Sequence, residues 1–251
     1  MDLATLAGLL IGTMSVGYIM VDGGMLGILR DVSSFMFVFG GTFSSTLMTY
    51  PWKSFKKIPG ALMLILFPPK FISSKDIITR MCELSRAAAL RGIDALPEMI
   101  YEDDPAFIKT GLKILINNWS ENDIRKYMNQ EMDATVDRHS EVQKMFESMG
   151  SYAPIYGLLG TLIGVLGLLK HLGDPTAMGN SMSKAITTFY GIFFANFVAL
   201  PAAGKLEAYS NQELLMKSLI LEGIVSIKRE DLPFVVRDKL EMIVEQSIRQ
   251  A

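Results

Sequence analysis

The chain has 251 residues, half of them apolar, with a mean hydropathy of +0.30 and a formal net charge of −2. This hydropathy is high for a soluble protein and indicates a membrane protein, while the near-neutral charge provides no basic surface for nucleic acid. The single cysteine, Cys82, excludes an internal disulfide, and its sequence neighbourhood lacks the spacing of a metal site.

Residues 1–50 contain two apolar runs, 3–21 and 32–50, without a strongly charged side chain. Each run is long enough to cross the ~30 Å hydrocarbon core as a helix. The first run has neither a basic flank before it nor a small-residue cleavage site after it, so we expect a retained anchor rather than a signal peptide. The second is followed by Trp52 and Lys53, which are typical of the membrane–water interface.

Residues 51–150 predict a water-soluble helical domain. Its apolar segment 61–67 is too short to span a membrane and is expected at the interface. Further on, apolar residues recur every three or four positions, and Ser73 and Ser120 are helix-capping candidates. The last of these patterns continues up to the next apolar run, which predicts one helix extending from the cytoplasm into the membrane.

Two further uncharged runs, 151–169 and 185–204, predict a second pair of spans, and residues 205–251 predict a helical tail that packs on the soluble domain. The expected fold class is an all-α integral membrane protein with four transmembrane helices and a cytoplasmic helical domain. Of the 24 Lys and Arg residues, 14 lie in 51–150 and 7 follow Pro201. These segments, and with them both termini, are therefore expected in the cytoplasm.

The second pair of spans contains Thr161, Thr187 and Thr188. Each hydroxyl alone could bond to the carbonyl one turn back in its own helix. Together, three hydroxyls at similar depth could replace part of the hydration shell of a cation. The same spans contain Pro154 and Pro201, each of which removes one helical hydrogen bond and predicts either a static kink or a hinge.

None of the four predicted spans contains Asp, Glu, Lys or Arg, although a cation path normally needs an anionic group at membrane depth. If the chain conducts cations, another polypeptide must supply the carboxylate. The sequence shows no phosphate loop, metal cluster or nucleophile constellation, so neither an enzyme nor a cofactor is expected.

Several local motifs match a known family in order along the chain. They are Met1-Asp2-Leu3-Ala4-Thr5-Leu6, Asp31-Val32-Ser33-Ser34, Gly40-Gly41-Thr42, Tyr152-Ala153-Pro154, Gly157-Leu158-Leu159-Gly160-Thr161-Leu162-Ile163-Gly164, Thr187-Thr188-Phe189-Tyr190-Gly191 and Ala195-Asn196 with Pro201. With these motifs the chain resembles the A subunit of the bacterial flagellar stator, the MotA/PomA type of the MotA/TolQ/ExbB superfamily. ExbB and TolQ proteins share the Gly-Leu-Leu-Gly-Thr pattern.

The resemblance implies a ring of five A subunits around two B subunits of the MotB/PomB type in the bacterial inner membrane. In that family an aspartate of the B subunit carries the ion, H⁺ or Na⁺, and a periplasmic domain of the B subunit holds peptidoglycan. Ion passage turns the A ring, whose cytoplasmic helices contact the rotor protein FliG.

The resemblance also assigns roles to residues of this chain. Thr188 matches a pore-facing threonine, and Asp31 matches an outer acidic residue of the sodium-type members. Thr161 and Thr187 match the sodium type as well, which favours sodium, although protons stay open because the ion site itself lies on the B subunit.

Pro154 and Pro201 match two functional prolines of the family. The charged residues that contact the rotor are shifted in this sequence relative to the family pattern, which leaves Arg86, Arg91 and Glu98 as candidates. All three could equally be solvated helix charges.

Two other functions fit part of the sequence. An ExbB/TolQ-like energiser of the outer membrane shares the polar residues of the second pair of spans, but such proteins have three spans and an outer N-terminus, against which the first pair argues. A non-conducting membrane scaffold would be excluded by ion flux in the presence of a B subunit.

Overall fold

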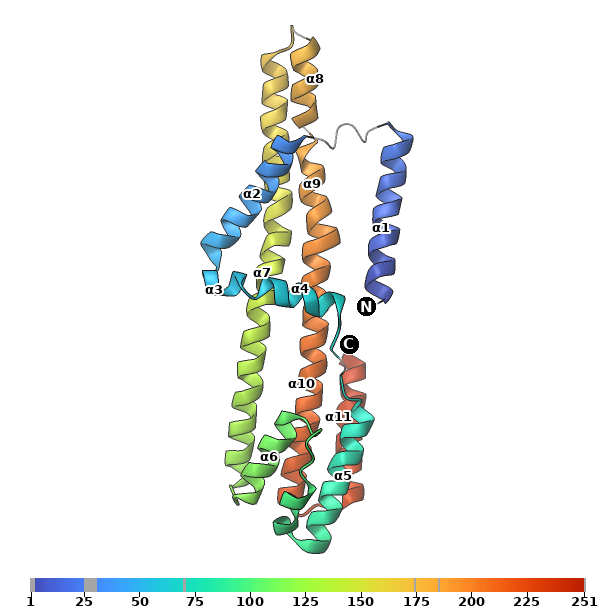
Figure 1. The fold of residues 1–251 in the computed structure, drawn as a ribbon, viewed down its shortest axis with the longest axis vertical. Helices are drawn as coiled ribbons and strands as arrows, with labels where there is room; N and C mark the ends of the chain where they lie inside the picture. Colours follow the sequence, from blue (N-terminus) through green and yellow to red (C-terminus); the bar gives the residue numbers. More distant parts are fainter. Residues whose placement is uncertain (1–2, 25–30, 70, 174, 185, 251) are drawn as a thin grey trace. The chain divides into compact units, whose positions relative to one another are not determined.

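The computed structural model describes residues 3–24, 31–69, 71–173, 175–184 and 186–250, and this part of the chain is helical without a strand (Figure 1). The elements are α1 (Leu3–Asp22), α2 (Val32–Thr49), α3 (Trp52–Phe55), α4 (Ile58–Leu66), α5 (Ser74–Arg91), the 3₁₀-helix η2 (Ile93–Met99), α6 (Ala106–Ile116), α7 (Glu121–Lys170), α8 (Pro175–Lys184), α9 (Thr187–Phe194), the π-helix η3 (Ala195–Ala199), α10 (Leu200–Lys228) and α11 (Pro233–Gln250).

The chain divides into two compact units. Unit 1 comprises Met1–Pro69 and His139–Glu207, and unit 2 comprises Lys70–Arg138 and Ala208–Ala251. Each unit is described by itself.

Unit 1 contains the uncharged segments that the sequence predicts as membrane spans. Within the described residues, three helical stretches are long and apolar enough to cross a membrane: Thr5–Asp22, Glu121–Lys170 and Thr187–Lys228. The α2 helix, which covers the second predicted span, is outside this set because seven of its 18 residues are Ser or Thr. Most of these hydroxyls need a partner if the helix enters a membrane.

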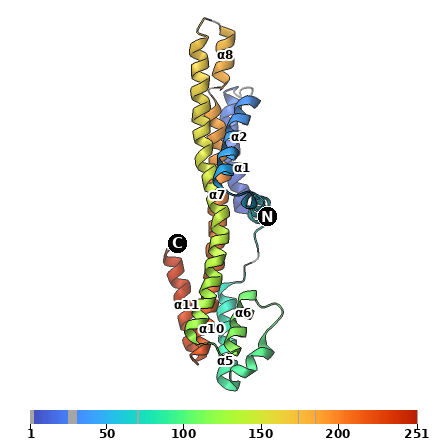
Figure 2. The ribbon, with the colours of Figure 1, turned by 90° about the vertical axis from the view of Figure 1, so that its left-hand side faces the viewer.

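The predicted continuity of one helix through residue 150 is confirmed, because α7 runs unbroken from Glu121 to Lys170. The connection to the fourth predicted span contains a helix that the sequence did not predict. This helix is α8, which lies beside the last turns of α7 (Figures 1 and 2). The fourth span was predicted to begin at residue 185, which lies outside the described residues, and α9 begins at Thr187.

Tyrosine hydroxyls connect α2 to α7. The Tyr156 hydroxyl lies 2.7 Å from the Ser45 hydroxyl, and the Tyr152 hydroxyl lies 3.1 Å from that of Thr49. At the end of α2, the Tyr50 hydroxyl donates to the Lys144 carbonyl at 2.9 Å. These contacts satisfy polar groups that an apolar environment would penalise.

The core of unit 1 includes the part of α7 that precedes the third predicted span. Val142, Met145, Phe146 and Met149 pack with Ile65 of α4 and with small residues of α10. Residues 139–150 therefore pack within unit 1, although the sequence pattern of α7 does not change there. The apolar stripe of α7 is continuous, so its period does not indicate where one set of packing partners ends.

Unit 2 has a separate core. Side chains from α5, α6, the first turns of α7, α10 and α11 contribute to it, and Met81, Leu112, Met128, Leu219 and Val236 are fully buried. Burying a side chain of this size stabilises the fold by about 1.5–3 kcal/mol. The predicted packing of the C-terminal tail on the central soluble segment is confirmed.

The helix ends of unit 2 follow the signals in the sequence. The Ser73 hydroxyl accepts a hydrogen bond from the Lys75 amide, and the Ser120 hydroxyl accepts one from the Asp123 amide. Gly92 ends α5 with φ of +82°, a conformation that glycine adopts without strain. Cys82 is half-buried, and its thiol lies 3.5 Å from the Pro233 carbonyl at the start of α11.

Two polar clusters stabilise unit 2. In the first, the Arg80 guanidinium donates to both carboxylate oxygens of Asp104, at 3.0 and 2.8 Å, and stacks over the Tyr101 ring. Burial alone would raise the pKa of Asp104, but the hydrogen bonds from Arg80 and from the Tyr101 amide lower it.

The second cluster connects the start of α7 to the end of α10. Glu121 accepts hydrogen bonds from Arg229 and Arg125, and Arg125 also pairs with Glu222 at 3.0 Å. The hydrogen bonds from Arg229 and then Arg125 lower the pKa of Glu121 to about 2.

Candidate functional site

Thr161 of α7 and Thr188 of α9 form a hydroxyl pair. The two Oγ1 atoms are hydrogen-bonded to each other, and each lies 3.1 Å from the carbonyl oxygen of Gly157. Each hydroxyl has one hydrogen, so two of these three contacts can form at a time, and the lone pairs of both hydroxyls can accept from or coordinate a further group. Both side chains are half-buried, which leaves the pair partly accessible in the isolated chain.

Glycines bring the two helices close enough for this pair. A Cβ on Gly191 would lie 2.2 Å from the Ala153 carbonyl oxygen, and a Cβ on Gly157 would lie 2.9 Å from the Thr188 Cα. At Gly160 a Cβ would lie 2.4 Å from the Thr187 methyl group. Only a residue without a side chain fits these positions, so the close approach of α7 and α9 is built into the sequence.

Thr187 is turned away from the pair. Its side chain is buried and its methyl group faces Gly160. Its single hydroxyl hydrogen can be donated to the Ser34 hydroxyl of α2 at 2.9 Å or to the Lys184 carbonyl of the preceding turn. The three threonines that the sequence suggested as one cluster therefore separate into a pair, Thr161 and Thr188, and a third side chain that contacts α2.

Ser34 connects Thr187 to Asp31. The Ser34 hydroxyl donates to one carboxylate oxygen of Asp31 at 2.6 Å, while the Ser33 amide donates to the other at 3.0 Å. Asp31 is thus the N-cap of α2 and the end of a hydrogen-bonded chain from α9. The hydrogen bonds from Ser33 and Ser34 lower the pKa of Asp31, so the carboxylate is ionised at neutral pH.

Sequence reasoning did not single out Ser34 as a site residue. Its signal was the Asp31-Val32-Ser33-Ser34 pattern at the start of an apolar run, which is typical of a helix N-terminus. The pattern predicts the cap, but the contact with Thr187 joins residues far apart in the sequence and needs the fold.

The two prolines occupy different environments. Pro154 is half-buried inside α7, and its Cα lies 3.1 Å from the position of a Cβ on Gly191. Because proline has no N–H, the helical bond to the Gly150 carbonyl is missing. Pro201 is exposed and is the second residue of α10. It follows Leu200, whose amide donates to the Ala195 carbonyl at the end of the π-helix.

The π-helix η3 was not predicted. Its wider turn breaks the α-helical register of the fourth span between Thr188 and Pro201, and such turns often occur at functional sites. Asn196, inside this turn, donates its side-chain amide to the Ile192 carbonyl at 2.9 Å.

The rotor-contact candidates lie in unit 2, whereas the threonines lie in unit 1. Arg86 and Arg91 are exposed on α5, and Glu98 is exposed on η2. The structure thus places them on an accessible surface without bringing them into one cluster with the other site residues.

The described residues contain no group of His, Cys, Asp and Glu that could hold a metal ion. What the geometry provides instead is neutral oxygen: two hydroxyls and one backbone carbonyl on an uncharged stretch of two closely packed helices. Such oxygens can coordinate a partly dehydrated cation but cannot neutralise its charge.

Comparison with known proteins gives the family. The model of the MotA/TolQ/ExbB proton channel family matches residues 101–218. The chain is 33% identical to the chemotaxis protein PomA of Vibrio alginolyticus over 253 residues, with 99% of this chain and 98% of PomA covered. It is 30% identical to motility protein A of Bacillus subtilis (strain 168), with 96% and 90% covered.

A solved structure agrees with these relatives. The flagellar MotAB stator complex from Bacillus subtilis contains a chain that matches with a TM-score of 0.86 and 28% identity over 100% of this chain and 98% of that chain. The similarity to motility proteins extends over both predicted pairs of spans, which favours this branch over the ExbB/TolQ type. The chain therefore belongs to the MotA/TolQ/ExbB proton channel family, and it is similar to the flagellar stator proteins MotA and PomA over most of their length.

Proposed function

We propose that this flagellar stator A subunit, together with a B subunit of the MotB/PomB type, conducts cations inward across the bacterial inner membrane and converts their flow into torque. The observation that carries the proposal is the Thr161–Thr188 hydroxyl pair at the Gly157 carbonyl. It provides acceptors, without a charge of its own, on a half-buried surface between two apolar helices.

The charge that this pair lacks is supplied by the B subunit in the proposed complex. Residues 151–169 and 185–204 contain no carboxylate, and a cation at membrane depth is costly without one. An aspartate on the single membrane helix of the B subunit, placed against α7 and α9, completes the site. We propose the family arrangement of five A subunits around two B subunits.

Sodium is the ion that the polar residues favour. Hydroxyl and carbonyl oxygens can coordinate Na⁺ directly, and the hydrogen-bonded chain from Asp31 through Ser34 to Thr187 brings an ionised carboxylate close to the same helices. Protons remain the alternative because the ion-carrying group belongs to the B subunit.

Coupling to rotation is proposed to pass along α7 and α10. Each is a continuous helix with a proline in its uncharged part. Their other ends are joined by an ion pair between Glu121, the first residue of α7, and Arg229, which directly follows α10. A change of register at η3 would move the helix α10, and a bend at Pro154 would move α7. In both cases the moving segment is a helix and not a loop. The energy is adequate, since each elementary charge that crosses ~100 mV releases ~2.3 kcal/mol.

The soluble helices of unit 2 are proposed to contact the rotor protein FliG through Arg86, Arg91 and Glu98. Both termini are proposed to be cytoplasmic, because most Lys and Arg residues lie in segments 51–150 and 205–251.

The test is rotation of a motile strain that lacks stators and receives this chain with its genomic B subunit. Torque is measured as sodium is replaced by potassium at constant pH and membrane potential. Torque that falls with sodium supports a sodium motor, and torque that is indifferent to sodium assigns protons. Absence of torque from a correctly assembled complex contradicts the proposal.

A further inference from the structure

The α3 and α4 helices present a surface of unit 1 that the stator proposal does not use. This collar, defined as residues 52–67, directly follows the second predicted span, and α4 runs across α7 rather than along it (Figure 1). Its partly exposed side chains are of two kinds. The aromatic and basic ones are Trp52, Lys53 and Lys56, and the apolar ones are Leu62, Met63, Leu66 and Phe67.

One face of α3 is fixed to α7. Ser54 is buried, and its hydroxyl donates to the Glu141 carboxylate, which also pairs with the Lys57 ammonium. The hydrogen bonds from Lys57 and Ser54 lower the pKa of Glu141. The charge of Lys57 is thus compensated within the protein.

The other face of α3 carries uncompensated positive charge. Trp52 and Lys56 are one helical turn apart, so they lie on the same face, and Lys53 is adjacent. No carboxylate in the described part of the chain is within ion-pair distance of Lys53 or Lys56. Trp52 is 65% exposed and stacks on Phe55 with 6.1 Å between ring centroids.

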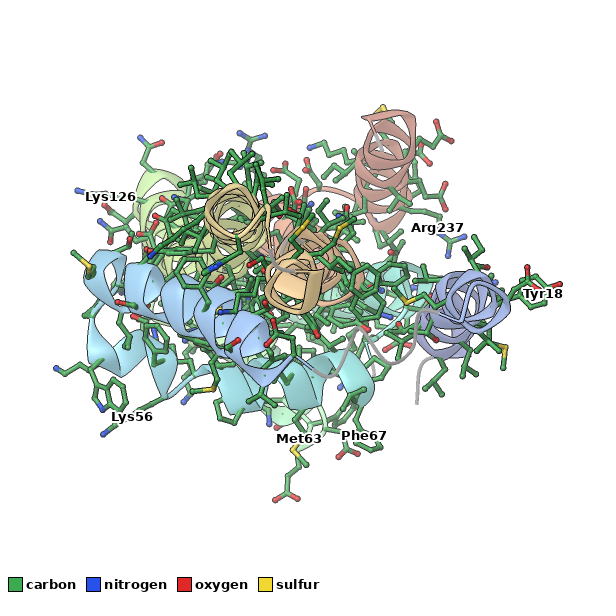
Figure 3. The ribbon with its side chains drawn as sticks, turned by 90° about the horizontal axis from the view of Figure 1, so that it is seen from above. Tyr18, Lys56, Met63, Phe67, Lys126 and Arg237 are labelled. Carbon is green, nitrogen blue, oxygen red and sulfur yellow. The ribbon has the colours of Figure 1, made fainter. Side chains whose placement is uncertain are left out.

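The α4 helix is apolar on both sides. Ile58, Ala61 and Ile65 pack against the core of unit 1, while Met63 and Phe67 are 65% and 56% exposed. Viewed from above, Lys56, Met63 and Phe67 project from the same side of the molecule (Figure 3). Because α4 is apolar all round, its outer side is expected to be shielded from water by another apolar surface.

Exposed lysines and a tryptophan beside an apolar helix surface indicate which kind of partner covers the collar. We propose that the collar binds anionic phospholipid of the cytoplasmic leaflet, with the apolar side chains of α4 among the upper acyl chains and Lys53 and Lys56 at the phosphates beside Trp52. Aromatic and basic residues next to an apolar surface are the signature of the lipid interface, and lysines there attract anionic headgroups. The inference rests on the membrane location proposed above but not on the motor.

The chain contains its own probe for this contact. It has two tryptophans, and changing Trp119 to Phe leaves Trp52 alone while keeping an aromatic ring next to Tyr127. This W119F chain is purified with a B subunit whose tryptophans have been replaced by phenylalanine. The complex is reconstituted in phosphatidylcholine bilayers that contain brominated phosphatidylglycerol or brominated phosphatidylcholine at equal mole fraction.

Bromine quenches tryptophan only at close range. We expect stronger quenching of Trp52 by the phosphatidylglycerol, corresponding to a preference of about five-fold for each lysine that contacts a headgroup. The K53Q/K56Q variant should bring the preference close to one, as should high salt, which screens the charges. The matched control is K126Q, because Lys126 is also exposed but lies in unit 2 on α7.

Three outcomes overturn the proposal. If neither lipid quenches Trp52, protein rather than lipid covers the collar, and a second copy of the chain becomes the candidate. Equal quenching by both lipids removes the anionic preference and leaves the membrane location intact. A preference that survives in K53Q/K56Q assigns it to other residues. None of these results depends on torque, so the stator proposal is tested separately.

Discussion

The close approach of α7 and α9 at Gly191 gives a prediction whose size follows from the structure. A Cβ at this position would lie 2.2 Å from the Ala153 carbonyl oxygen and 2.8 Å from its carbonyl carbon. Since nonbonded carbon contacts lie near ~3.5 Å, the G191A variant must separate the helices by about 1 Å. Backbone atoms cannot rotate out of the way as a flexible side chain can.

The matched variant is G204A. Gly204 is also helical, but nothing lies within 4 Å of its Cβ position. Both substitutions gain about 1 kcal/mol of helix propensity, so the difference between them isolates the steric cost. Overpacking typically costs about 1–3 kcal/mol.

The assay is thermal unfolding of the purified stator complex in one detergent. For a chain of this size 1 kcal/mol corresponds to about 2–4 °C, so G191A should melt about 4–8 °C below G204A for a cost near the middle of that range. Torque in a stator-less strain should fall in parallel. A G191A complex as stable as G204A would refute the close-packing argument.

Three further predictions concern single contacts. T188V keeps the shape of Thr188 but removes its hydroxyl, so it should abolish torque while the complex still assembles, whereas T188S should retain torque. The control is T46V, which should leave torque unchanged because the Thr46 hydroxyl donates to its own helix. Equal torque in T188V and T188S would remove Thr188 from the ion path. D104N should lower the unfolding free energy by about 2–3 kcal/mol, because it weakens the charged hydrogen bonds between Arg80 and Asp104, whose side chains are 12% and 7% exposed. The comparison is the unfolding free energy of D103N, in which an exposed neighbouring carboxylate is changed. The pKa of Glu121 is lowered from 4.5 to about 2, so its stabilising contribution is complete above pH 4.5 and is lost as the pH falls from about 4.5 to about 2. The free energy of unfolding of E121Q should therefore depend less on pH in this window. Identical pH profiles of stability for E121Q and the unchanged chain would contradict the lowered pKa of Glu121.

Much of the fold could be predicted from local patterns. The uncharged runs became helices, Ser73 and Ser120 are caps, and α7 continues through residue 150 as its unbroken apolar stripe suggested. These features depend on residues within a few turns of each other. Periodicity and capping report such local preferences directly.

The features that the sequence missed have different physical causes. The π-helix at Ala195–Ala199 has no composition of its own, and it is defined by which carbonyl the Leu200 amide selects. The α8 segment contains Gly, Asn and Ser, which weaken a helical pattern. The orientation of Thr187 towards Ser34 could not be separated from that of Thr188, because the two are adjacent and chemically identical.

The hydroxyl pair has a consequence for the speed of the proposed ion step. The two hydroxyl hydrogens can be distributed in several ways: either threonine can donate to the carbonyl while the other donates to its neighbour, or both can donate to the carbonyl. The arrangements interconvert by rotation of two O–H bonds and move no heavy atom. The local dipole can therefore reverse on the timescale of side-chain rotation, far faster than the microsecond-to-millisecond motion of a helix. If the pair coordinates the ion as proposed, reorientation of these hydroxyls is faster than any step that moves a helix.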